Sequence, residues 1–558
     1  MRTTRRSKLL LVPLLALAIV AAACGSDDNN NATGTTAAGE DGGELIDLGT
    51  FAPNAPEHID PGLNSELRAY QVVNALYDGL TEFDFSDPDN PEVKGLVAES
   101  FESNADATVW TFTIKKGLTF DNDEAVLPSS FVRGWERASG KDLNSAGDYS
   151  YLFKAIQGGA EKLAGTAQTL AGVKADDAAM TLEVTLSAPY ANFPAVAGFQ
   201  TFYPMPKATE ALADQKDWEK GVMIGNGPYK LEKPRNDQEI VVVRNDKWAG
   251  DIFGNKRAKL DKITFKISQD VESAYNSFEA GEGDIATIPP GRYTEARENY
   301  GTTSDTDIAG SYFFSFDMND PAVGGAGNKL LRQAMSLAID RESINTAAYD
   351  GIRETATSLT PKGIPGFEAG LCDYCDYDKA AAQKAFDDWK AAGNSQTAPI
   401  KVQFNTDAGQ EPVVAIIVDN LKAIGIDAVG EPLDGETYFS MLSDGACQFC
   451  RQGWYADYPI YDNFLYDLFH SSTIGGNNLG PYSSPAFDAL VDEAKRTLDP
   501  QAAADANHRA ERVLLNDDVG TIPINWYKGD YAFNADKVKG FEQNSLGLIP
   551  FELVTVNG

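Results

Sequence analysis

The stretch LRQAMSLAIDR, from Leu331 to Arg341, shows what kind of structure forms at the centre of this chain. Its apolar residues recur at the spacing of one helix face: Leu331, Ala334, Met335, Ala338 and Ile339. Asn328 precedes them as a possible helix cap. Outward from this stretch, the pattern predicts further helices over 413–424, 378–392 and 486–515, the last one broken near Asp499-Pro500.

Strand patterns are interleaved with these helices. In one segment Trp110, Phe112 and Ile114 alternate with threonines, which is the period of a half-buried strand. The same period occurs at Met180 to Leu186, Ile240 to Val243 and Ile263 to Ile267. Interleaved strands and helices predict an α/β fold, but the pattern leaves the strand connections open.

Length and charge limit the possible classes of protein. The chain has 558 residues, of which 43% are hydrophobic and 10% aromatic, enough for a large core divided among about two or three domains. Its formal net charge of −35 argues against nucleic acid or anionic lipid as a partner. Most of these acidic residues are expected to form a solvated surface.

The amino terminus has the layout of an export signal. Four basic residues precede an apolar run of 15 residues, Leu9 to Ala23, and the small residues Ala21 to Ala23 stand directly before Cys24. A membrane-spanning helix needs roughly 20 apolar residues, so the run suits a signal peptide, residues 1–23, better than a span. Small residues before a cysteine resemble the cleavage site of bacterial lipoproteins, which implies that Cys24 carries lipid. The alternative is an ordinary secretory signal with a chance cysteine.

Residues 24–43 are predicted to be a flexible, lipid-anchored linker. From Ser26 to Gly43 they include no aromatic or large aliphatic side chain that could be buried against a core. Such a tether would let the globular part move around its anchor.

No enzymatic motif organises a nucleophile with its base. The chain has three histidines and lacks Gly-x-Ser-x-Gly, His-Glu-x-x-His and Walker sequences. Two of its many carboxylates could in principle form a glycosidase pair, but that possibility has no specificity. The sequence therefore predicts no catalytic residue, no metal and no cofactor.

Four of the five cysteines form two Cys-x-x-Cys pairs, Cys372 with Cys375 and Cys447 with Cys450. In a cytosolic protein this arrangement would indicate a zinc site. Outside the cell disulfides are favoured over zinc, and the even count fits two bridges. The sequence does not decide whether each bridge lies within a pair or links the two pairs.

Several segments together resemble the family 5 solute-binding proteins of bacterial ABC importers, the group that binds peptides. In chain order they are Asp60-Pro61, 73–80, 95–100, 110–120, 225–230, 280–285, 331–341, Gly453-Trp454-Tyr455-Ala456-Asp457-Tyr458-Pro459 and 482–488. Each segment is weak by itself. Their order and spacing make coincidence improbable, and they run through nearly the whole mature chain.

The resemblance implies a two-lobed fold of the periplasmic binding protein type (type II) with a hinge between the lobes and an extra subdomain on one lobe. Mapped onto this chain, lobe I takes 44–82, 188–310 and 521–558, the extra subdomain takes 83–187, and lobe II takes 311–520. Ligand binding would then close the lobes, and the importer would recognise the closed form.

The resemblance also implies a binding site around Asp457. In similar oligopeptide binders the aspartate of this stretch pairs with the α-ammonium of the peptide, a strong charge-assisted contact in an enclosed cleft. Gly453, Trp454 and Tyr455 would offer an edge for an extended peptide, and Trp526 and Tyr527 would form the opposite wall. The alternatives are that Asp457 caps a turn before Pro459 and that the aromatic residues belong to the core.

The implied function is that of a monomeric receptor on the outer face of the cytoplasmic membrane. It would capture oligopeptides and deliver them to an ABC permease whose ATPase subunits supply the energy. A second hypothesis keeps the receptor and changes the cargo to an oligosaccharide, an opine or a metal chelate. Asp457 discriminates here, since a sugar has no ammonium to pair with it. A third is an extracellular enzyme or adhesion protein on the same tether.

Overall fold

The structure is a computed structural model that describes residues 42–52, 54–144, 148–252, 254, 258–406 and 409–557. The predicted signal peptide, Cys24 and almost all of the linker lie outside the described residues. None of the helices in the described ranges is both long enough and apolar enough to span a membrane.

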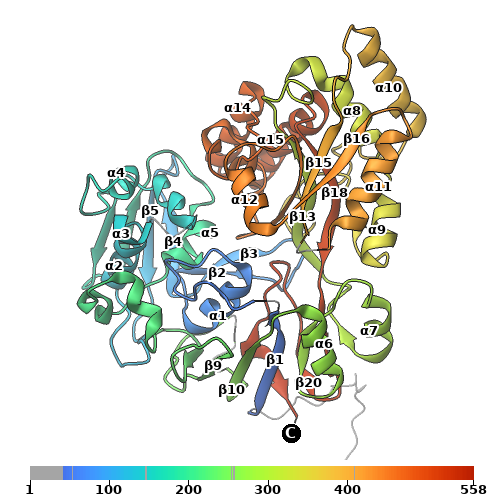
Figure 1. Ribbon diagram of the computed structural model, residues 1–558. Helices are drawn as coiled ribbons and strands as arrows, with labels where there is room; N and C mark the ends of the chain where they lie inside the picture. The colour runs from blue at the N-terminus through green and yellow to red at the C-terminus, as the bar shows by residue number, and fades with distance from the viewer. Residues whose placement is uncertain are drawn as a thin grey trace, which may run out of the picture. The chain divides into compact units, whose positions relative to one another are not determined.

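A seven-stranded sheet contains the first strand of the described chain and one of the last. Its strand order is β12 (Gly301–Thr302), β19 (Tyr531–Phe533), β11 (Ile285–Thr287), β1 (Glu44–Phe51), β10 (Lys262–Ile267), β9 (Glu239–Arg244) and β8 (Tyr229–Leu231). The central strand β1 runs parallel to β10 and β11. Helix α6 (Val271–Glu279) buries Ala274, Tyr275 and Phe278 in a cluster with Leu48 of β1. Helices α1 (Leu67–Leu76) and α7 (Tyr293–Asn299) lie near the same sheet in Figure 1.

The second large sheet has six strands. Its order is β14 (Glu354–Thr355), β18 (Thr521–Lys528), β13 (Asp307–Phe316), β17 (Phe449–Tyr455), β15 (Ile400–Asn405) and β16 (Ala428–Leu433). Alternate residues of β13 pack into different clusters, Tyr312 and Phe314 into one and Phe313 into another, so both faces of this sheet are covered. In Figure 1 one face carries α8 (Lys329–Ala338), α9 (Arg341–Tyr349), α10 (Lys379–Ala391) and α11 (Glu411–Lys422), and the other carries α14 (Pro485–Arg496) and α15 (Pro500–Arg512).

A four-stranded antiparallel sheet completes the larger elements. Its order is β4 (Ala98–Ser103), β5 (Val109–Ile114), β7 (Thr181–Thr185) and β6 (Val173–Asp176), with α2 (Pro128–Ala138) beside it. In β5 the predicted alternation is confirmed, because Trp110, Phe112 and Ile114 are buried. There are also two small antiparallel sheets of two strands each, β2 (Thr81–Asp84) with β3 (Glu92–Gly95) and β20 (Val538–Lys539) with β21 (Thr555–Val556). The remaining α-helices are short: α3 (Lys141–Asn144), α4 (Gly159–Leu163), α5 (Phe193–Ala197), α12 (Gly435–Ser443) and α13 (Tyr466–Phe469).

The prediction of a mixed α/β fold is confirmed, with two local corrections. The stretch around Leu331 forms two helices, because α8 ends at Ala338 and Asp340 starts α9 by accepting a hydrogen bond from the backbone N–H of Ser343 at 3.0 Å. Asn328 stands at the start of α8, but its side chain makes no capping bond to the helix; it donates to the carbonyls of Pro321 and Gly324. The predicted break near residue 499 is confirmed, since Asp499 caps α15 and Pro500 begins it.

The chain passes twice between the two large sheets. It leaves β12 for β13 through residues 303–306, and it returns from β18 to β19 through Gly529 and Asp530. The two crossings are bonded to each other, because Gly529 N–H donates to the Thr306 carbonyl at 3.0 Å and Thr303 N–H donates to the Tyr531 carbonyl at 2.9 Å. A Cβ on Gly529 would lie 2.4 Å from the Thr303 carbonyl oxygen, so the close approach of the two segments requires glycine there.

Arg341 is buried behind the six-stranded sheet, with 3% of its surface exposed. Its guanidinium donates to the carbonyls of Pro523 in β18, Cys375, Ser336 and Ile339, at distances from 2.6 to 3.3 Å. Burial lowers the pKa of Arg341 to about 9. The side chain thus joins a strand, the end of α8 and the loop that contains Cys375 through carbonyls that have been removed from water.

Candidate functional site

The carboxyl-terminal half of β17 has an open edge. Strand β13 pairs with β17 along its whole length, from Phe449 to Tyr455, whereas β15 pairs only with Phe449 and Cys450. Among the strand pairings of the described ranges, no strand pairs with the other side of Gly453, Trp454 and Tyr455. An extended chain can add to such an edge through backbone hydrogen bonds.

Asp457 follows this edge directly, and Asn463 fixes its position. The side-chain oxygen of Asn463 accepts hydrogen bonds from Asp457 N–H and from Trp454 Nε1, both at 2.9 Å. Its amide nitrogen donates to Asp457 Oδ2 at 3.0 Å and to Asp467 Oδ2 at 3.1 Å. Tyr149, 308 residues away in sequence, donates its hydroxyl to Asp457 Oδ1 at 2.7 Å. The carboxylate is therefore held by neutral donors on both oxygens.

The Asp457 carboxylate has no cationic partner in the described part of the chain. Burial raises the pKa of Asp457 to about 7; the hydrogen bonds from Asn463 and Tyr149 oppose this shift, and the nearby charge of Asp467 adds to it. A buried carboxylate in this state is stabilised strongly by an arriving cation. The chemistry of this arrangement is suited to pairing with a positively charged group.

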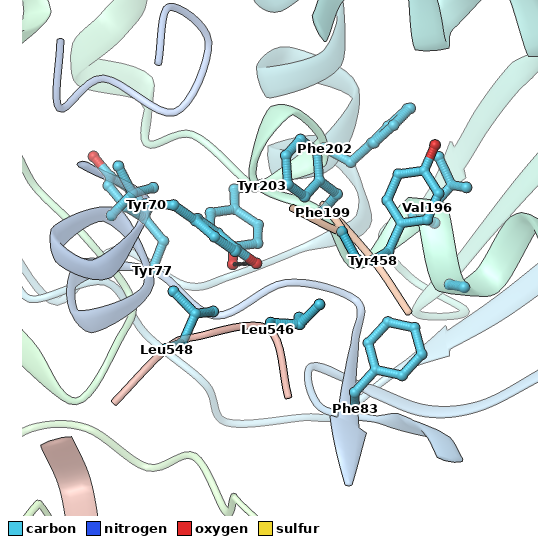
Figure 2. Close-up of a cluster of buried hydrophobic side chains, with 14 of the residues drawn as sticks. Tyr70, Tyr77, Phe83, Val196, Phe199, Phe202, Tyr203, Tyr458, Leu546 and Leu548 are labelled. Atoms are coloured by element: carbon cyan, nitrogen blue, oxygen red, sulfur yellow. Dashed lines mark hydrogen bonds between the residues drawn. The ribbon is translucent and has the colours of Figure 1, made fainter. Parts of the chain in front are cut away.

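Asp457 lines a small cavity with aromatic walls. Figure 2 shows Tyr70, Phe83, Phe199 and Tyr458 of these walls within one cluster of buried side chains. Tyr70 comes from α1, Phe83 from β2, Phe199 from the segment after α5, and Tyr458 from the loop after β17. A second carboxyl side chain, that of Glu82, lines the same cavity. The cavity therefore brings together segments that are hundreds of residues apart in sequence.

Tyr455 and Tyr527, both expected at the site, contact each other. Their rings stack with centroids 4.5 Å apart, and Tyr455 is 41% exposed beside the open edge. The guanidinium of Arg353 lies 4.5 Å from the ring centre of Tyr527 and 3.7 Å from that of Tyr349. A Cβ on Gly453 would lie 2.2 Å from the Tyr527 hydroxyl, so glycine is what lets the Tyr527 side chain, which comes from β18, reach over β13 to β17.

Trp454 and Trp526 lie differently. Trp454 is half-buried and bonded to Asn463, which attaches the open edge to the loop that holds Asp457. Trp526 is 4% exposed, donates to the Ser358 carbonyl at 3.2 Å and packs edge-on against Phe367. These contacts are those of a core residue, and a ligand contact by Trp526 stays a prediction.

Sequence reasoning did not identify Tyr149, Asn463, Tyr70 or Glu82. Asn463 is only six residues beyond Asp457, but nothing in the local pattern distinguishes it from a turn residue. The other three lie in segments brought to Asp457 only by the tertiary structure. The local sequence motif therefore identifies Asp457 alone, whereas the other residues of the site come from several distant segments.

The cysteines form two disulfides, each within its own Cys-x-x-Cys pair. Cys372 bonds to Cys375 and Cys447 to Cys450, with Cα atoms 5.5 and 5.8 Å apart. The described ranges contain no cluster of ligands that could hold a metal ion. A cross-link over so short a loop contributes about 2 kcal/mol in the chain-entropy account. The second bridge closes the turn into β17, seven residues before Asp457.

Residues 92–476 match the profile described as "Bacterial extracellular solute-binding proteins, family 5 Middle". The oligopeptide-binding protein OppA of Bacillus subtilis is 26% identical over 516 residues, 89% of this chain and 90% of the relative. The haem-binding protein A of Haemophilus influenzae is 25% identical over 536 residues, 90% of this chain and 91% of the relative. The structure of Listeria monocytogenes OppA bound to peptide superposes with a TM-score of 0.69 at 26% identity, covering 93% of this chain and all of that one.

Proposed function

Because the chain belongs to the bacterial extracellular solute-binding proteins of family 5, which are substrate receptors and not enzymes, we propose that it captures oligopeptides outside the cell for an ABC importer. The observation that carries the proposal is the partly buried Asp457 carboxylate, which has no cationic partner among the described residues and stands after the open edge of β17. A peptide offers both complements, an α-ammonium for the carboxylate and a backbone for the edge.

Peptide selectivity would then rest mainly on the amino terminus. Backbone hydrogen bonds along Gly453, Trp454 and Tyr455 are indifferent to side chains. A peptide without a free ammonium would lose this charge-assisted contact, which contributes about 1.5 to 3 kcal/mol. The B. subtilis relative, named for oligopeptide binding, supports this cargo.

Delivery would follow from closure of two lobes around the peptide. The proposed division keeps the ranges 44–82, 188–310 and 521–558 for lobe I, 83–187 for the extra subdomain and 311–520 for lobe II. The two bonded crossings at Thr303–Thr306 and Gly529–Asp530 are the short links between the large sheets and support a hinge near these boundaries. A hinge at the crossings would assign β13 from Asp307 and the whole of β18 to lobe II. A permease and its ATPase subunits would recognise the closed monomer, which would be held at the membrane by lipid on Cys24.

A non-peptide cargo is the second candidate. The H. influenzae relative is named for haem binding, so related chains of similar length differ in the ligand they take. A haem or sugar ligand lacks the α-ammonium that the Asp457 carboxylate would pair with.

Mass spectrometry of the gently purified mature protein tests cargo and anchor together. Native spectra are expected to show a heterogeneous bound mass that fragments, after denaturation, into short peptides. The denatured protein is expected to start at Cys24 and to carry acyl chains. A single bound sugar, haem or metal chelate would contradict the proposal of a peptide cargo. An unmodified Cys24 would contradict the proposal of a lipid anchor.

Affinity for peptides is expected to fall in acid. The Asp457 carboxyl has a pKa of about 7 without ligand, and ammonium pairing requires its ionised form, so below pH 7 binding must expel a proton. The groups that face it, Tyr149, Asn463, Tyr458 and Asp467, provide no other cation for it. Isothermal titration is expected to show an affinity loss of about 20-fold from pH 7.5 to 5.5 for a free-amino peptide. An N-acetylated peptide that loses as much would show that another group titrates.

A further inference from the structure

Lys495, in the last turn of α14, contacts the segment that precedes α5. Its backbone carbonyl accepts a hydrogen bond from Ala191 N–H at 2.9 Å. The carbonyls of a last helical turn lack donors within the helix, so this one is available to a donor from another segment. The ammonium of Lys495 lies 4.5 Å from the ring centre of Tyr190 and 3.6 Å from that of Tyr466 in α13. One residue therefore makes a hydrogen bond and two cation–π contacts.

These contacts join the regions of two different sheets. Tyr190 is 5% exposed and is attached to the four-stranded sheet, because its carbonyl accepts a hydrogen bond from Trp110 Nε1 at 3.2 Å and its N–H donates to the Ala107 carbonyl at 3.0 Å. Helix α14 instead lies on the six-stranded sheet (Figure 1). In the proposed division Tyr190 and Ala191 belong to lobe I, and Lys495 belongs to lobe II. The contacts therefore cross a boundary that separates when the lobes open.

Two carboxyl groups of the loop and helix after β17 hold the ammonium at this boundary. Asp462 and Asp467 are 3% and 6% exposed. Burial raises the pKa of both groups, to about 6 for Asp462, and the charge of Lys495 opposes the rise in each. Both carboxyl groups come from the same lobe as Lys495. Tyr190 therefore meets a cation that its own lobe has already positioned, which lowers the entropy cost of the contact.

The contacts of Lys495 are separate from the proposed peptide site. They involve neither Asp457 nor the open edge of β17. The rings of Phe199 and Tyr458 make a further contact between the same two lobes, edge to face with centroids 6.0 Å apart. Contacts made only by groups of the protein are available both with and without a peptide. They therefore stabilise the closed form whether or not the cleft is filled.

We propose that Lys495 latches the two lobes together, with Tyr190 and Ala191 as its partners across the boundary, and that this latch slows both the entry and the release of peptide. Closure by the latch needs the two lobes but no peptide, whereas its effect on peptide exchange rests on the proposed function. Because the latch stabilises the filled and the unfilled closed forms alike, its loss speeds exchange in both directions and changes the ratio of the two rates little.

Electron paramagnetic resonance distance measurements test the latch in protein freed of bound peptide by partial denaturation and refolding. Spin labels are attached through Glu99→Cys on β4 and Gln501→Cys on α15, both exposed positions. Lys495→Met is expected to raise the ratio of open to closed molecules about tenfold, the effect of losing a cation–π contact in a partly desolvated place. Lys495→Arg keeps a cation and is expected to keep the wild-type distances.

Lys390→Met is the matched control. The ammonium of Lys390 lies 4.5 Å from the ring centre of Phe386, but both residues belong to α10, so this cation–π contact crosses no boundary. Tyr190→Leu is expected to open the lobes as Lys495→Met does, and it carries the test if Lys495→Met fails to fold. Tyr190→Phe keeps a ring face and is expected to stay closed. Thermal unfolding checks that each variant is folded.

Stopped-flow fluorescence with a free-amino alanine pentapeptide measures the effect on exchange. In Lys495→Met the association and dissociation rates are both expected to rise about tenfold, with Kd within about threefold of the wild type. Faster dissociation without faster association would show that Lys495 only retains the peptide, which overturns the proposal.

Unchanged distances in Lys495→Met and Tyr190→Leu, or equal opening by Lys390→Met, also overturn the latch. Peptide binding by the same proteins would then leave the receptor function intact. If the wild type binds no peptide while Lys495→Met still opens the lobes, the proposed function fails and the latch between the lobes stands. The two failures are therefore distinguishable.

Discussion

Asp457→Ala is expected to weaken binding of a peptide with a free amino terminus by at least about 100-fold. The physical reason is that the substitution leaves the α-ammonium enclosed without its counter-charge, which costs about 3 to 5 kcal/mol. The N-acetylated form of the same peptide is expected to bind the variant about as well as it binds the wild type. Isothermal titration of both peptides against both proteins measures the difference.

Two further variants separate charge from fold. Asn463 and Tyr149 donate to different oxygens of Asp457, so Asp457→Asn keeps the shape and one of these two hydrogen bonds but not the charge. It should lose nearly as much affinity as alanine. Asp444→Ala, at an exposed aspartate after α12, should change neither affinity. Equal losses for the free and acetylated peptides in Asp457→Ala would remove the ammonium-pairing role.

Arg341→Met is expected to lower the free energy of unfolding by about 3 to 5 kcal/mol, the largest stability loss that we predict. Methionine can fill the space, but it cannot donate to the carbonyls of Pro523, Cys375, Ser336 and Ile339, which would remain buried. The Ser336 carbonyl keeps the hydrogen bond from Ile339 N–H. An acceptor left without a donor costs about 1 to 3 kcal/mol, partly offset because a buried charge is removed as well.

Urea-induced unfolding followed by tryptophan fluorescence measures this effect. Arg496→Met, at an exposed arginine that ends α14, is the control and should stay within about 0.5 kcal/mol of the wild type. A change of that small size in Arg341→Met would mean that the four carbonyls find other donors, such as water, once the guanidinium is gone.

The local pattern predicted the elements well where burial alternates or repeats regularly. The strand around Phe112 and the break at Asp499-Pro500 follow from residue spacing and from cap chemistry, both of which act over a few residues. The division between α8 and α9 was missed because Ile339 continues the apolar period while Asp340 already caps the next helix. At this point the helix cap at Asp340, and not the apolar period, determines where one helix ends and the next begins.

The site was only partly predictable for a different reason. Asp457 was named through a resemblance, since its own neighbourhood is equally compatible with a turn cap. Tyr149 and Glu82 reach the same cavity across hundreds of residues, and no spacing rule connects them to it. The disulfide pairing was open for the same reason, because two Cys-x-x-Cys pairs allow several connectivities until the backbone brings particular sulfur atoms together.

The late position of β18 and β19 in the chain determines when the protein can fold. Each lies inside a large sheet, β18 between β14 and β13 and β19 between β12 and β11, although both follow residue 520. Helix α1 is also bonded to the last segment of the chain, since the Gln71 side chain makes two hydrogen bonds of 2.8 Å to the backbone of Ile549. A chain that emerges amino terminus first from a secretion channel therefore cannot close either sheet until nearly all of it has crossed. For an exported chain, translocation would therefore precede the closure of both large sheets, which needs the last forty or so residues.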